Sequence, residues 1–326
     1  MTTDYKKVLI TGVAGFVGSN LAKALLDNNV EVIGIDDFSH GFKRNIEPLL
    51  TNKKFQFIEG DVRNENTFKG LNADVIVHLA SQKIPRYSSA LLVLDDNSLM
   101  TKNIVKKCIN DKIKMVFAST SDIYGKNPKL PYSETSDMLL GPTTVKRWAY
   151  AISKIYSEQY LIANHEEFGL NYTIMRFFGS YGTNQNPTWW GGPQSVFIEK
   201  TYNDDFIELH GDGSQTRTFT YIDDTVQGVM KCIFHENSHN DIFNIAGDPD
   251  SEITIKDLAH LIWGLMRPGT EPKIKCIPYS TFGNYEDVQR RLPDINKIKS
   301  KLGYEPKWKL AEGLKQAIEW QTKLYK

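Results

Sequence analysis

Tyr150 and Lys154 place a phenol and an ammonium group four residues apart in the stretch 147–154, whose composition favours a helix. Residues four apart lie on one face of a helix, so the two side chains can reach the same small volume. A tyrosine ordinarily loses its proton near pH ~10, and a positive neighbour favours the phenolate. The spacing therefore predicts a tyrosine base whose pKa is lowered by Lys154, although a core tyrosine beside a solvated lysine gives the same pattern.

A glycine-rich loop follows the first apolar run of the chain, residues 7–11, and precedes a helical pattern over residues 19–26. A strand, a glycine turn and a helix in this order form a cradle for phosphate, because glycine lets the backbone approach a pyrophosphate and the helix start offers free N–H groups. The spacing is G-x-x-G-x-x-G rather than the G-x-G-x-x-G of many dinucleotide sites. We expect the loop to bind a dinucleotide through Gly12, Gly15, Phe16, Val17 and Gly18.

The second predicted strand, residues 31–35, ends in Asp36 and Asp37, about 20 residues beyond the glycine loop. A carboxylate at this strand end can accept hydrogen bonds from both hydroxyl groups of the adenosine ribose and repels a 2′-phosphate, so it favours NAD over NADP. We expect Asp36 to be an exposed acid that carries little packing energy. An ordinary acidic turn is the alternative.

Two further strand ends carry residues suited to the same ligand. Residues 55–58 lead to Asp61 and Val62, where the acid can meet the adenine amino group. Residues 74–81 form an apolar run in which His78 is expected to be a hydrogen-bonded core histidine rather than a ligand. Open parallel sheets hold ligands at the carboxyl ends of their strands, so small residues there indicate a binding edge. This run ends in Leu79, Ala80 and Ser81.

A fourth core strand, residues 114–118, ends in hydroxyl and carboxyl groups. It follows a predicted helix over residues 91–110 that carries Asn97. Thr120 and Asp122 lie between this strand and a loop rich in Gly, Pro and Asn, which indicates site chemistry rather than packing. We therefore count both as catalytic candidates.

The composition argues against several classes of function. Lysine plus arginine equal aspartate plus glutamate at 39 each, so neither nucleic acid nor an anionic membrane is expected as the main partner. The three cysteines, Cys108, Cys232 and Cys276, are far apart, so neither a disulfide framework nor a metal site is predicted. No apolar run approaches the ~18 residues of a membrane helix, and we expect a cytoplasmic protein.

Strands and helices alternate through the first half of this chain of 326 residues. The alternation predicts an α/β fold of the Rossmann type, a right-handed, doubly wound parallel sheet with a smaller C-terminal substrate-binding region. We place the dinucleotide-binding domain at residues 1–180, with segments near 219–246 returning to it. Residues 181–326 form mainly the substrate-binding region and end in a predicted helix over 310–325.

Four further segments complete a pattern that runs nearly the whole length of the chain. They are Ala-Ser-Thr-Ser-Asp-Ile-Tyr-Gly at 118–125, Arg-Phe-Phe-Gly-Ser-Tyr-Gly at 176–182, Gly-Asp-Gly-Ser-Gln-Thr-Arg at 211–217 and Arg-Leu-Pro-Asp at 291–294. With the glycine loop, the Asp36 strand end and the Tyr–Lys pair, they resemble the extended short-chain dehydrogenase/reductase family of NAD-dependent nucleotide-sugar epimerases, dehydratases and decarboxylases. The resemblance is specific for the fold and for NAD, and less specific for the reaction.

The resemblance implies a role for each residue at a matching position. Tyr150 is the base, Lys154 holds the nicotinamide ribose and polarises Tyr150, and Thr120 hydrogen-bonds the sugar hydroxyl that is oxidised. Guanidinium groups match phosphate oxygens in bidentate geometry, which gives the arginines of the pattern an independent reason to bind a diphosphate. The remaining implied contacts are Lys83 and Asn97 with cofactor and substrate, Phe178 with the nicotinamide, and Arg217 and Arg291 with the nucleotide diphosphate.

Two departures from the family pattern lie near the expected substrate. Gly179 stands where the family usually has asparagine, so a side-chain amide that contacts the substrate there is missing. The loop 184–194 carries Trp189 and Trp190, then two glycines, and ends at Gln194, which we place in the substrate site. Paired indoles beside flexible backbone can stack on a sugar or a base, or the loop can tuck back onto the core.

The reaction step implied by the resemblance is oxidation of a sugar hydroxyl, usually at C4, and three outcomes can follow. Return of the hydride to the other face gives a 4-epimer, loss of a carboxylate beta to the ketone gives decarboxylation, and expulsion of a C6 hydroxyl gives a 4,6-dehydratase. Dehydratase relatives carry Asp-Glu after the threonine and decarboxylase relatives carry Ser-Glu, whereas this chain has Ser121-Asp122. We expect a UDP-sugar 4-epimerase, with UDP-glucuronate decarboxylase as the second reading and a 4,6-dehydratase as the third.

A non-catalytic NAD-binding sensor or scaffold is the alternative from another class, since a fold alone does not give a function. The joint presence of Thr120, Tyr150 and Lys154 argues against it. Family members commonly pair through the helices equivalent to 91–110 and 148–168, so the resemblance also implies a homodimer.

Overall fold

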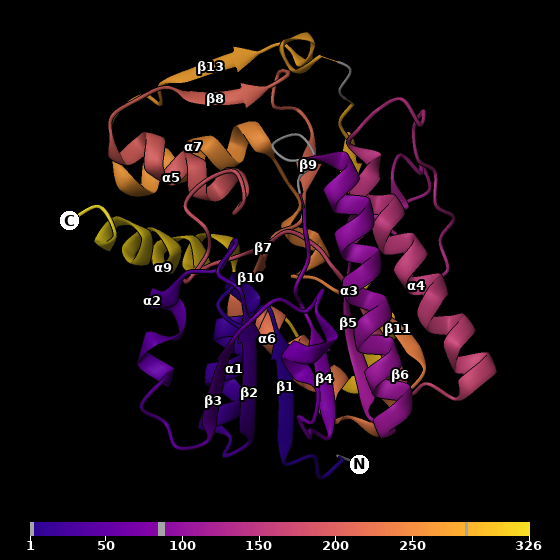
Figure 1. Cartoon of the computed structure of the whole chain (residues 1–326). Coiled ribbons are helices and arrows are strands. Elements are labelled where there is room, and N and C mark those ends of the chain that lie inside the picture. Colours follow the sequence, from indigo (N-terminus) through magenta and orange to yellow (C-terminus); the bar gives the residue numbers. More distant parts are fainter. Residues whose placement is uncertain (1–2, 84–88, 284–285) are drawn as a thin grey trace.

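A computed structural model describes residues 3–83, 89–283 and 286–326, which form two lobes (Figure 1). Within these residues, the larger lobe holds a seven-stranded parallel sheet in the order β11-β6-β5-β4-β1-β2-β3. This order is the doubly wound, Rossmann-type arrangement predicted from the sequence. The strands are β1 (Lys7–Thr11), β2 (Glu31–Asp36), β3 (Phe55–Glu59), β4 (Val75–His78), β5 (Lys114–Thr120), β6 (Tyr172–Phe177) and β11 (Asp241–Ile245).

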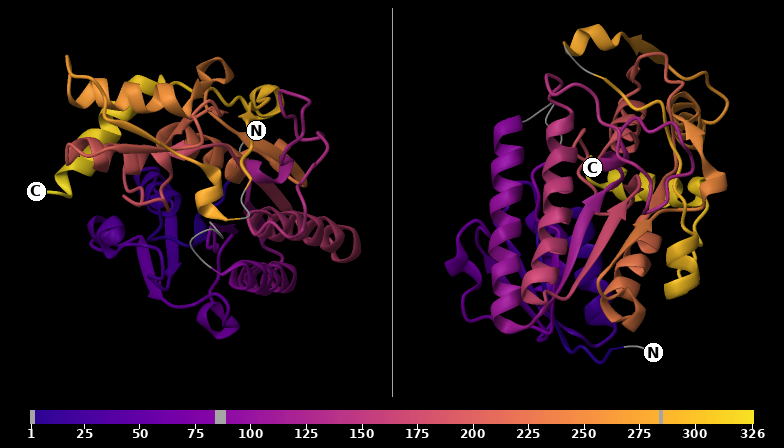
Figure 2. Two further views of the ribbon diagram at one scale, coloured as in Figure 1. Left: turned by 90° about the horizontal axis from the view of Figure 1, so that it is seen from above. Right: turned by 90° about the vertical axis from the view of Figure 1, so that its right-hand side faces the viewer.

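Alternate residues of β1 face different hydrophobic cores. Val8 and Ile10 pack with residues of α1 and α6, whereas Leu9 packs with residues of α3 and α4. Side chains alternate across a strand, so a continuous apolar run such as this one is buried on both faces of a parallel sheet. Figure 2 shows α3 and α4 side by side along one face. The covering helices are α1 (Phe16–Asp27), α3 (Ala90–Asp111), α4 (Trp148–Phe168) and α6 (Ile222–Phe234).

The smaller lobe lies beyond one end of the sheet strands, at the top of Figure 1. Its helix α5 packs against α7 and α9, and its strand β8 pairs in parallel with β13. Short strands join it to the larger lobe: β9 pairs with β12 and β14, and β7 pairs with β10. The bounds are α5 (Pro193–Tyr202), α7 (Ile255–Met266), α9 (Leu310–Lys323), β7 (Ser180–Tyr181), β8 (Ile207–His210), β9 (Thr216–Arg217), β10 (Thr220–Tyr221), β12 (Ile253–Thr254), β13 (Ile274–Ile277) and β14 (Arg290–Arg291).

The chain crosses between the lobes more than once after residue 181. The predicted segment 241–245 joins the sheet as β11, beside β6. Earlier in the same region, Thr220 and Tyr221 are extended as β10 and Ile222 begins α6. A late helix, α8 (Asn296–Leu302), also packs against β11. The lobes are therefore not two consecutive halves of the sequence. The larger lobe also contains the short helix α2 (Lys43–Ile46).

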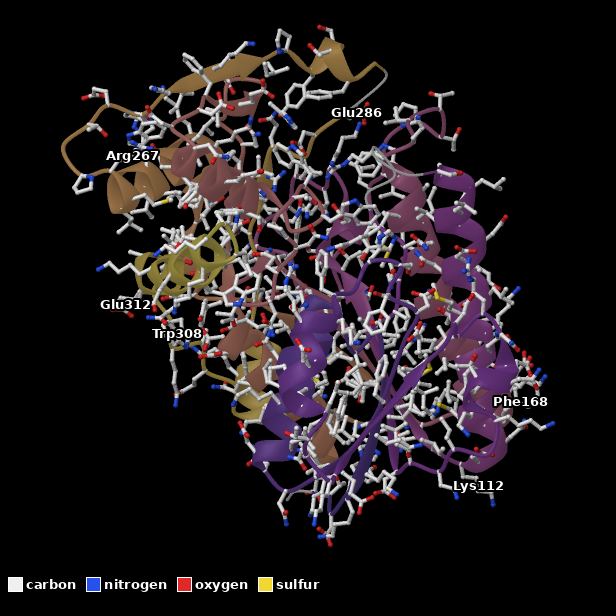
Figure 3. All side chains as sticks on the ribbon, turned by 60° about the vertical axis from the view of Figure 1, so that its left-hand side comes forward. Lys112, Phe168, Arg267, Glu286, Trp308 and Glu312 are labelled. Carbon is white, nitrogen blue, oxygen red and sulfur yellow. The ribbon has the colours of Figure 1, made fainter. Side chains whose placement is uncertain are left out.

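The two longest helices, α3 and α4, end at residues with left-handed backbone conformation. Lys112 has φ 56° and Gly169 has φ 70°, and their N–H groups bond to carbonyls of the last helical turn, which closes each helix. Figure 3 shows Lys112 and Phe168 at one end of the molecule, with Glu286, in the loop before β14, at the other end. No helix within the described ranges is both long and apolar enough to cross a membrane.

A buried ion pair joins α4 to β6. Arg176 Nη2 lies 2.6 Å from Glu158 Oε2, and both side chains are 3% exposed. Ser119 donates a hydrogen bond to Glu158, and Arg176 Nη1 donates to the Tyr124 hydroxyl at 3.0 Å. Charges removed from water are costly unless they are paired and hydrogen-bonded, so each partner depends on the other. The pair fixes α4 against the end of β5, directly before Thr120.

Glu158→Ala should lower the free energy of unfolding by about 3–5 kcal/mol, because it leaves the Arg176 guanidinium buried without its carboxylate. Urea denaturation followed by circular dichroism measures the loss. The exposed Glu319 of α9, whose carboxylate pairs with Lys323, provides the control. Glu319→Ala should leave the denaturation midpoint unchanged. Equal, small losses of unfolding free energy in the two variants would show that the buried pair stabilises the fold no more than the exposed one.

Candidate active site

Two adjoining cavities lie at the carboxyl ends of the sheet strands. The strand-end cavity, about 340 Å³, is lined by Gly12, Asp36 and Ala80 among others, and lies at the ends of β1, β2 and β4. The interlobe cavity, about 470 Å³, includes Arg217 of β9 and Phe197 of α5 among its lining residues and lies between this edge and the smaller lobe. A ligand in one cavity can therefore contact a ligand in the other. The residues that line both are Lys83, Thr120, Tyr150, Phe177, Ser180, Trp190 and Gly191.

The glycine loop forms a bare backbone wall of the strand-end cavity, at the point between β1 and β4 where the strand order reverses. Gly12 has φ +76°, and a Cβ there would lie 2.8 Å from the Ala80 nitrogen. A Cβ on Gly18 would meet the Gly12 carbonyl oxygen. Helix α1 begins after Gly15 without a side-chain cap, so its first N–H groups remain available. Backbone without side chains beside an uncapped helix start fits a pyrophosphate.

Asp36 lines the strand-end cavity but is not the exposed acid that we expected. Its side chain is buried, with 7% of the residue exposed. Oδ2 accepts a hydrogen bond from the Ala14 N–H at 2.9 Å, and Oδ1 accepts one from the Phe38 N–H at 2.8 Å. Burial raises the pKa of Asp36, and these two donors oppose the rise. The expectation of an exposed side chain is wrong because the glycine loop and the turn after β2 both fold onto the carboxylate.

The other acids expected near the adenosine differ in environment. Asp37 lines the cavity and accepts a hydrogen bond from the Ser39 N–H at 2.9 Å. Asp61 also lines it, and its carboxylate is paired with Arg63, whose Nε lies 2.8 Å from Oδ2. Val62 is buried and completes this side of the wall, and the end of β4 contributes Leu79, Ala80 and Ser81.

Asn97 and Phe178 lie outside the strand-end cavity. Asn97 is 3% exposed; its Nδ2 donates to the Gln82 carbonyl at 2.9 Å and to Ser153 Oγ at 3.0 Å, so it fixes the segment after β4 against α4. Phe178 lines the interlobe cavity, whereas its neighbour Phe177 lines both cavities. The structure therefore gives Asn97 a positioning contact, and Phe177 rather than Phe178 lines the strand-end cavity.

Tyr150, Thr120 and Lys154 come together where the two cavities meet. The Tyr150 phenol lies beside the hydroxyl groups of Ser81 and Thr120, which favour its ionised form. Lys154 Nζ donates to the Ala118 carbonyl oxygen at 2.9 Å and lies 5.8 Å from the centroid of the Tyr150 ring. Strand β5 supplies Ala118 and Thr120, and the first two turns of α4 supply the phenol and the ammonium group.

Burial favours the neutral forms of both Tyr150 and Lys154. The pKa of the Tyr150 phenol is raised, first by burial and then by the negative charge of Asp122. This direction is opposite to the one predicted from the Tyr–Lys spacing, because the phenol is buried, Asp122 lies in the same cavity, and the Lys154 ammonium group is directed at Ala118. Burial lowers the pKa of Lys154 to about 7.

His78, inside β4, is a core histidine as predicted. Its Nδ1 lies 2.7 Å from Oγ1 of Thr11, and the residue is 2% exposed. Burial, with the charge of Lys154 as a smaller cause, lowers its pKa to about 3. The ring is therefore neutral near pH 7.

A chain of three arginines and two aspartates lines the interlobe cavity. Arg291 Nη2 lies 2.6 Å from Asp122 Oδ1, and Arg147 Nη2 lies 3.2 Å from the same oxygen. Arg217 Nη2 lies 3.0 Å from Asp287 Oδ1, which Arg147 Nη1 also approaches to 3.5 Å. Burial disfavours the charge on Asp122, but the nearby guanidinium groups outweigh this effect and hold its pKa below the usual range. Asp122 is therefore ionised near pH 7 and is not a proton donor in this state.

Aromatic rings and a buried amide line the far side of the interlobe cavity. Trp189 stacks on His210 with ring centroids 4.7 Å apart, and His210 lies 4.4 Å from Phe282. Gln194, in the first turn of α5, is 2% exposed, and its Nε2 has no hydrogen-bond partner among the described residues. Buried polar groups are normally paired, so this amide fits a polar ligand in the cavity.

The structure gives a physical reason for glycine at position 179. Gly179 has φ +49°, and a Cβ there would lie 2.7 Å from the Thr218 carbonyl oxygen. An asparagine therefore cannot be added without moving the strand segment that carries Thr218 and Arg217. The polar groups on this wall come instead from Gln194 and Arg217.

The cavities also include residues that sequence reasoning does not identify, of which Arg147, His40 and Asp287 are examples. Arg147 belongs to the motif around Tyr150 and lies three residues before it on the same helical face, so its spacing indicates that it can reach the same cavity. His40 lines the strand-end cavity from a loop without a regular pattern. Asp287 comes from a loop that only the tertiary structure brings to Arg217, so no local signal predicts it.

Comparisons with known proteins find relatives along most of the chain. A model of the NAD dependent epimerase/dehydratase family matches residues 8–246. A UDP-N-acetyl-alpha-D-glucosaminuronate decarboxylase from Bacillus cytotoxicus is 32% identical over 97% of this chain and 97% of the relative. A putative UDP-glucose 4-epimerase from Methanocaldococcus jannaschii is 30% identical over 96% of this chain and 97% of the relative.

Solved structures resemble the whole chain as well. A UDP-glucuronic acid 4-epimerase from Bacillus cereus, in complex with UDP-glucuronic acid and NAD, superimposes with a TM-score of 0.86 at 28% identity. The match covers 98% of this chain and 100% of that one. A UDP-glucose 4-epimerase from Thermotoga maritima, with UDP-glucose, gives a TM-score of 0.86 at 29% identity with the same coverage.

Asp36→Ala should weaken NAD binding at least about tenfold and lower the free energy of unfolding by about 1–3 kcal/mol, because two buried N–H groups lose their acceptor. Isothermal titration calorimetry and urea denaturation measure the two effects. Asp36→Asn is the matched comparison: it keeps one of the two acceptor oxygens, so it should recover only part of the lost stability while the preference for NAD over NADP falls. Unchanged stability and unchanged NAD affinity in Asp36→Ala would show that the carboxylate holds neither the turn nor the ribose.

The buried Lys154 should make the stability of the free protein depend on pH. Its pKa of about 7 lies below the ordinary value of 10.5, so the unfolded chain binds more protons between these two values and stability rises with pH across that window. Lys154→Met removes this titration. The gain in unfolding free energy of the variant over the wild type should be largest below about pH 7 and shrink toward about pH 10. Urea denaturation without NAD measures it, and a gain that is constant with pH would rule out the shifted lysine.

Proposed function

Because the chain belongs to the NAD-dependent epimerase/dehydratase family, whose cofactor is NAD, we propose that it decarboxylates a UDP-hexuronic acid through a transient 4-keto sugar. The proposal combines a substrate class with one of the three outcomes open after oxidation at C4. Its support comes from the charges of the interlobe cavity and from relatives that act on UDP-uronic acids.

The charge of the interlobe cavity carries the proposal. The lining includes more cations than carboxylates, and three of the cations are arginines. A UDP-uronic acid brings a diphosphate and a sugar carboxylate, both of which match guanidinium groups in bidentate geometry. A neutral hexose needs fewer cations at its own end. The cations are Lys83, Lys146, Arg147, Arg217 and Arg291, and the carboxylates are Asp122, Glu208 and Asp287.

The residues at the junction of the cavities would perform the first step. When bound, NAD supplies a hydride acceptor and donor for C4 of the sugar. Thr120 and Tyr150, whose hydroxyl groups are neighbours, would hold the C4 hydroxyl, and Tyr150 would accept its proton once the phenol has lost its own proton to solvent. The ammonium group of Lys154, behind the ring, would stabilise the phenolate before it accepts that proton.

Loss of the carboxylate would follow from the position of Asp122 and Arg291. A carboxylate beta to a ketone leaves as carbon dioxide when the C5–C6 bond electrons move into the ketone, which becomes an enolate. The enolate oxygen at C4 would stay beside Thr120 and Tyr150, and the proton that replaces the carboxylate at C5 would come from water. Asp122, ionised at the same cavity wall, would disfavour a second carboxylate beside it, whereas Arg291 would hold the sugar in place.

A 4-epimerase acting on the same substrate is the second candidate. The adjacent glycines Gly191 and Gly192 line the interlobe cavity, and Gly192 has φ +99°. Backbone without side chains there leaves room for a keto sugar to turn and present its other face. Such a reaction retains every carbon, and several of the solved neighbours carry 4-epimerase names.

The outer faces of α3 and α4 support a further proposal, that two copies pair through these helices. Leu91, Leu92 and Leu99 of α3 are 44% to 64% exposed, and Ile152 and Tyr156 of α4 are each 39% exposed. The helices pack side by side, so these apolar residues belong to neighbouring surfaces. A monomeric mass by light scattering would contradict pairing.

The thiols of Cys108 and Cys232 are free and buried, which suits the reducing cytoplasm where we propose that the protein works.

Incubation of the purified protein with UDP-glucuronic acid and UDP-N-acetylglucosaminuronic acid, each with a catalytic amount of NAD, tests the proposal. At least one of them should yield one carbon dioxide per UDP-pentose without net NADH, as followed by proton NMR and a carbon dioxide assay. UDP-glucose should not react. Conversion to a UDP-hexuronic acid epimer with no carbon dioxide would replace decarboxylation by 4-epimerisation.

Variants separate the chemistry from the fold in the same assay. Tyr150→Phe should lower turnover at least about a hundredfold, because the proton acceptor is lost. Asp122→Asn should lower carbon dioxide release at least about tenfold, because the charge beside the sugar carboxylate is removed. Thermal melting confirms that both variants are folded. Wild-type turnover in Tyr150→Phe would favour the non-catalytic NAD-binding alternative.

A further inference from the structure

Two adjacent indoles stack on histidines that line different cavities. Trp190 stacks on His40 with ring centroids 4.2 Å apart and planes 26° apart. Trp189 stacks on His210 at 4.7 Å and also 26°. His40 lines the strand-end cavity, from the turn after β2, whereas His210 lines the interlobe cavity, at the end of β8. The tryptophan pair therefore lies at the border between the two cavities: Trp189 lines only the interlobe cavity, whereas Trp190 lines both and stacks on the histidine of the strand-end cavity.

We propose that Trp190 and His40 form a clasp that closes the strand-end cavity over NAD and retains it between turnovers, while Trp189 acts only on the nucleotide-sugar side. The inference rests on NAD as the cofactor and does not depend on which sugar is bound or how it is converted. It adds His40 and Trp190 to the residues that bind NAD.

The loop that carries Trp190 is fastened to the larger lobe. Asn20 Nδ2 of α1 donates to the Thr183 carbonyl at 3.0 Å, and Asn45 Nδ2 of α2 donates to the Asn184 carbonyl at 3.2 Å. Asn184 Nδ2 in turn donates to Ser19 Oγ at 3.1 Å. Although the loop leads into α5 of the smaller lobe, it forms part of the wall of the strand-end cavity, through Asn184, Gln185, Asn186, Trp190 and Gly191.

His40 is held from the opposite side of the same cavity. Its Nε2 lies 2.9 Å from Gln82 Oε1, and the Gln82 N–H donates to Asn97 Oδ1 at 2.8 Å. These contacts link the turn after β2 to the segment after β4 and to α3. The stack of His40 on Trp190 extends the link to the loop before α5. NAD held at Gly12 and Asp36 would then lie inside a ring of contacts that must open before it leaves.

Retention suits chemistry that takes a hydride and returns it within one active site. The same NAD serves every turnover, so fast exchange of the cofactor has no use, whereas the nucleotide sugar must enter and leave each time. A clasp on the strand-end cavity alone satisfies both needs. Aromatic pairs are stabilising by enough to change a dissociation rate roughly three- to tenfold.

The test is the rate at which bound NAD leaves the folded protein. The wild type, Trp190→Ala, His40→Ala and Trp189→Ala are loaded with NADH, and its fluorescence is followed after an excess of NAD is added. Trp190→Ala and His40→Ala should each release NADH at least about three times faster than the wild type. Trp189→Ala, the matched control from the same loop, should release it at the wild-type rate but bind UDP more weakly in calorimetry.

Two further readouts keep the inference open to contradiction. Trp190→Phe retains an aromatic ring on His40 and should restore slow release, and equal melting temperatures without cofactor show that the variants fold alike. Wild-type release from Trp190→Ala would overturn the clasp. Equal acceleration by Trp189→Ala and Trp190→Ala would also overturn it, because the loop as a whole, rather than the Trp190 ring, would then cover the cofactor.

Discussion

The carboxylate of Asp122 holds together three parts of the chain that are far apart in sequence. It follows β5 directly and pairs with Arg147, at the start of α4, and with Arg291 of β14. Because β14 belongs to the segment that joins the smaller lobe to the larger one, these contacts close the interlobe cavity beside Tyr150. Without the two aspartates, the three arginines would repel one another in a partly buried space. The site therefore depends on a balance of charges more than on any single contact.

The same balance sets the state of the groups that would exchange protons. Burial keeps Tyr150 protonated and brings the pKa of Lys154 to about 7, so neither side chain is preset in its reactive form. A bound diphosphate would draw the arginines toward itself and change the field around Asp122. The larger lobe can hold the three arginines and two aspartates of the interlobe cavity in place because the Glu158–Arg176 pair and two apolar cores fix the strand ends beneath them.

The sequence predicts the regular parts of this protein well, because local patterns determine them. The apolar runs, the glycine loop and the alternation of strands and helices lead to the observed parallel sheet, and His78 is the core residue that its position inside an apolar run indicates. The environments of charged groups are less predictable. Asp36 is buried since two turns fold onto it, and Asp287 reaches Arg217 from a loop distant in sequence. These contacts depend on tertiary structure, which spacing along the chain does not encode.

The most direct measurement is the fate of hydrogen at C4 and C5 of the sugar when the reaction runs in deuterium oxide. A UDP-hexuronic acid that loses its carboxylate at this site must take a solvent proton at C5, while C4 regains the hydrogen it gave up. Decarboxylation at this site should give a UDP-pentose with one deuterium at C5 and none at C4, as measured by NMR and mass spectrometry. A six-carbon product without deuterium, inverted at C4, would contradict decarboxylation.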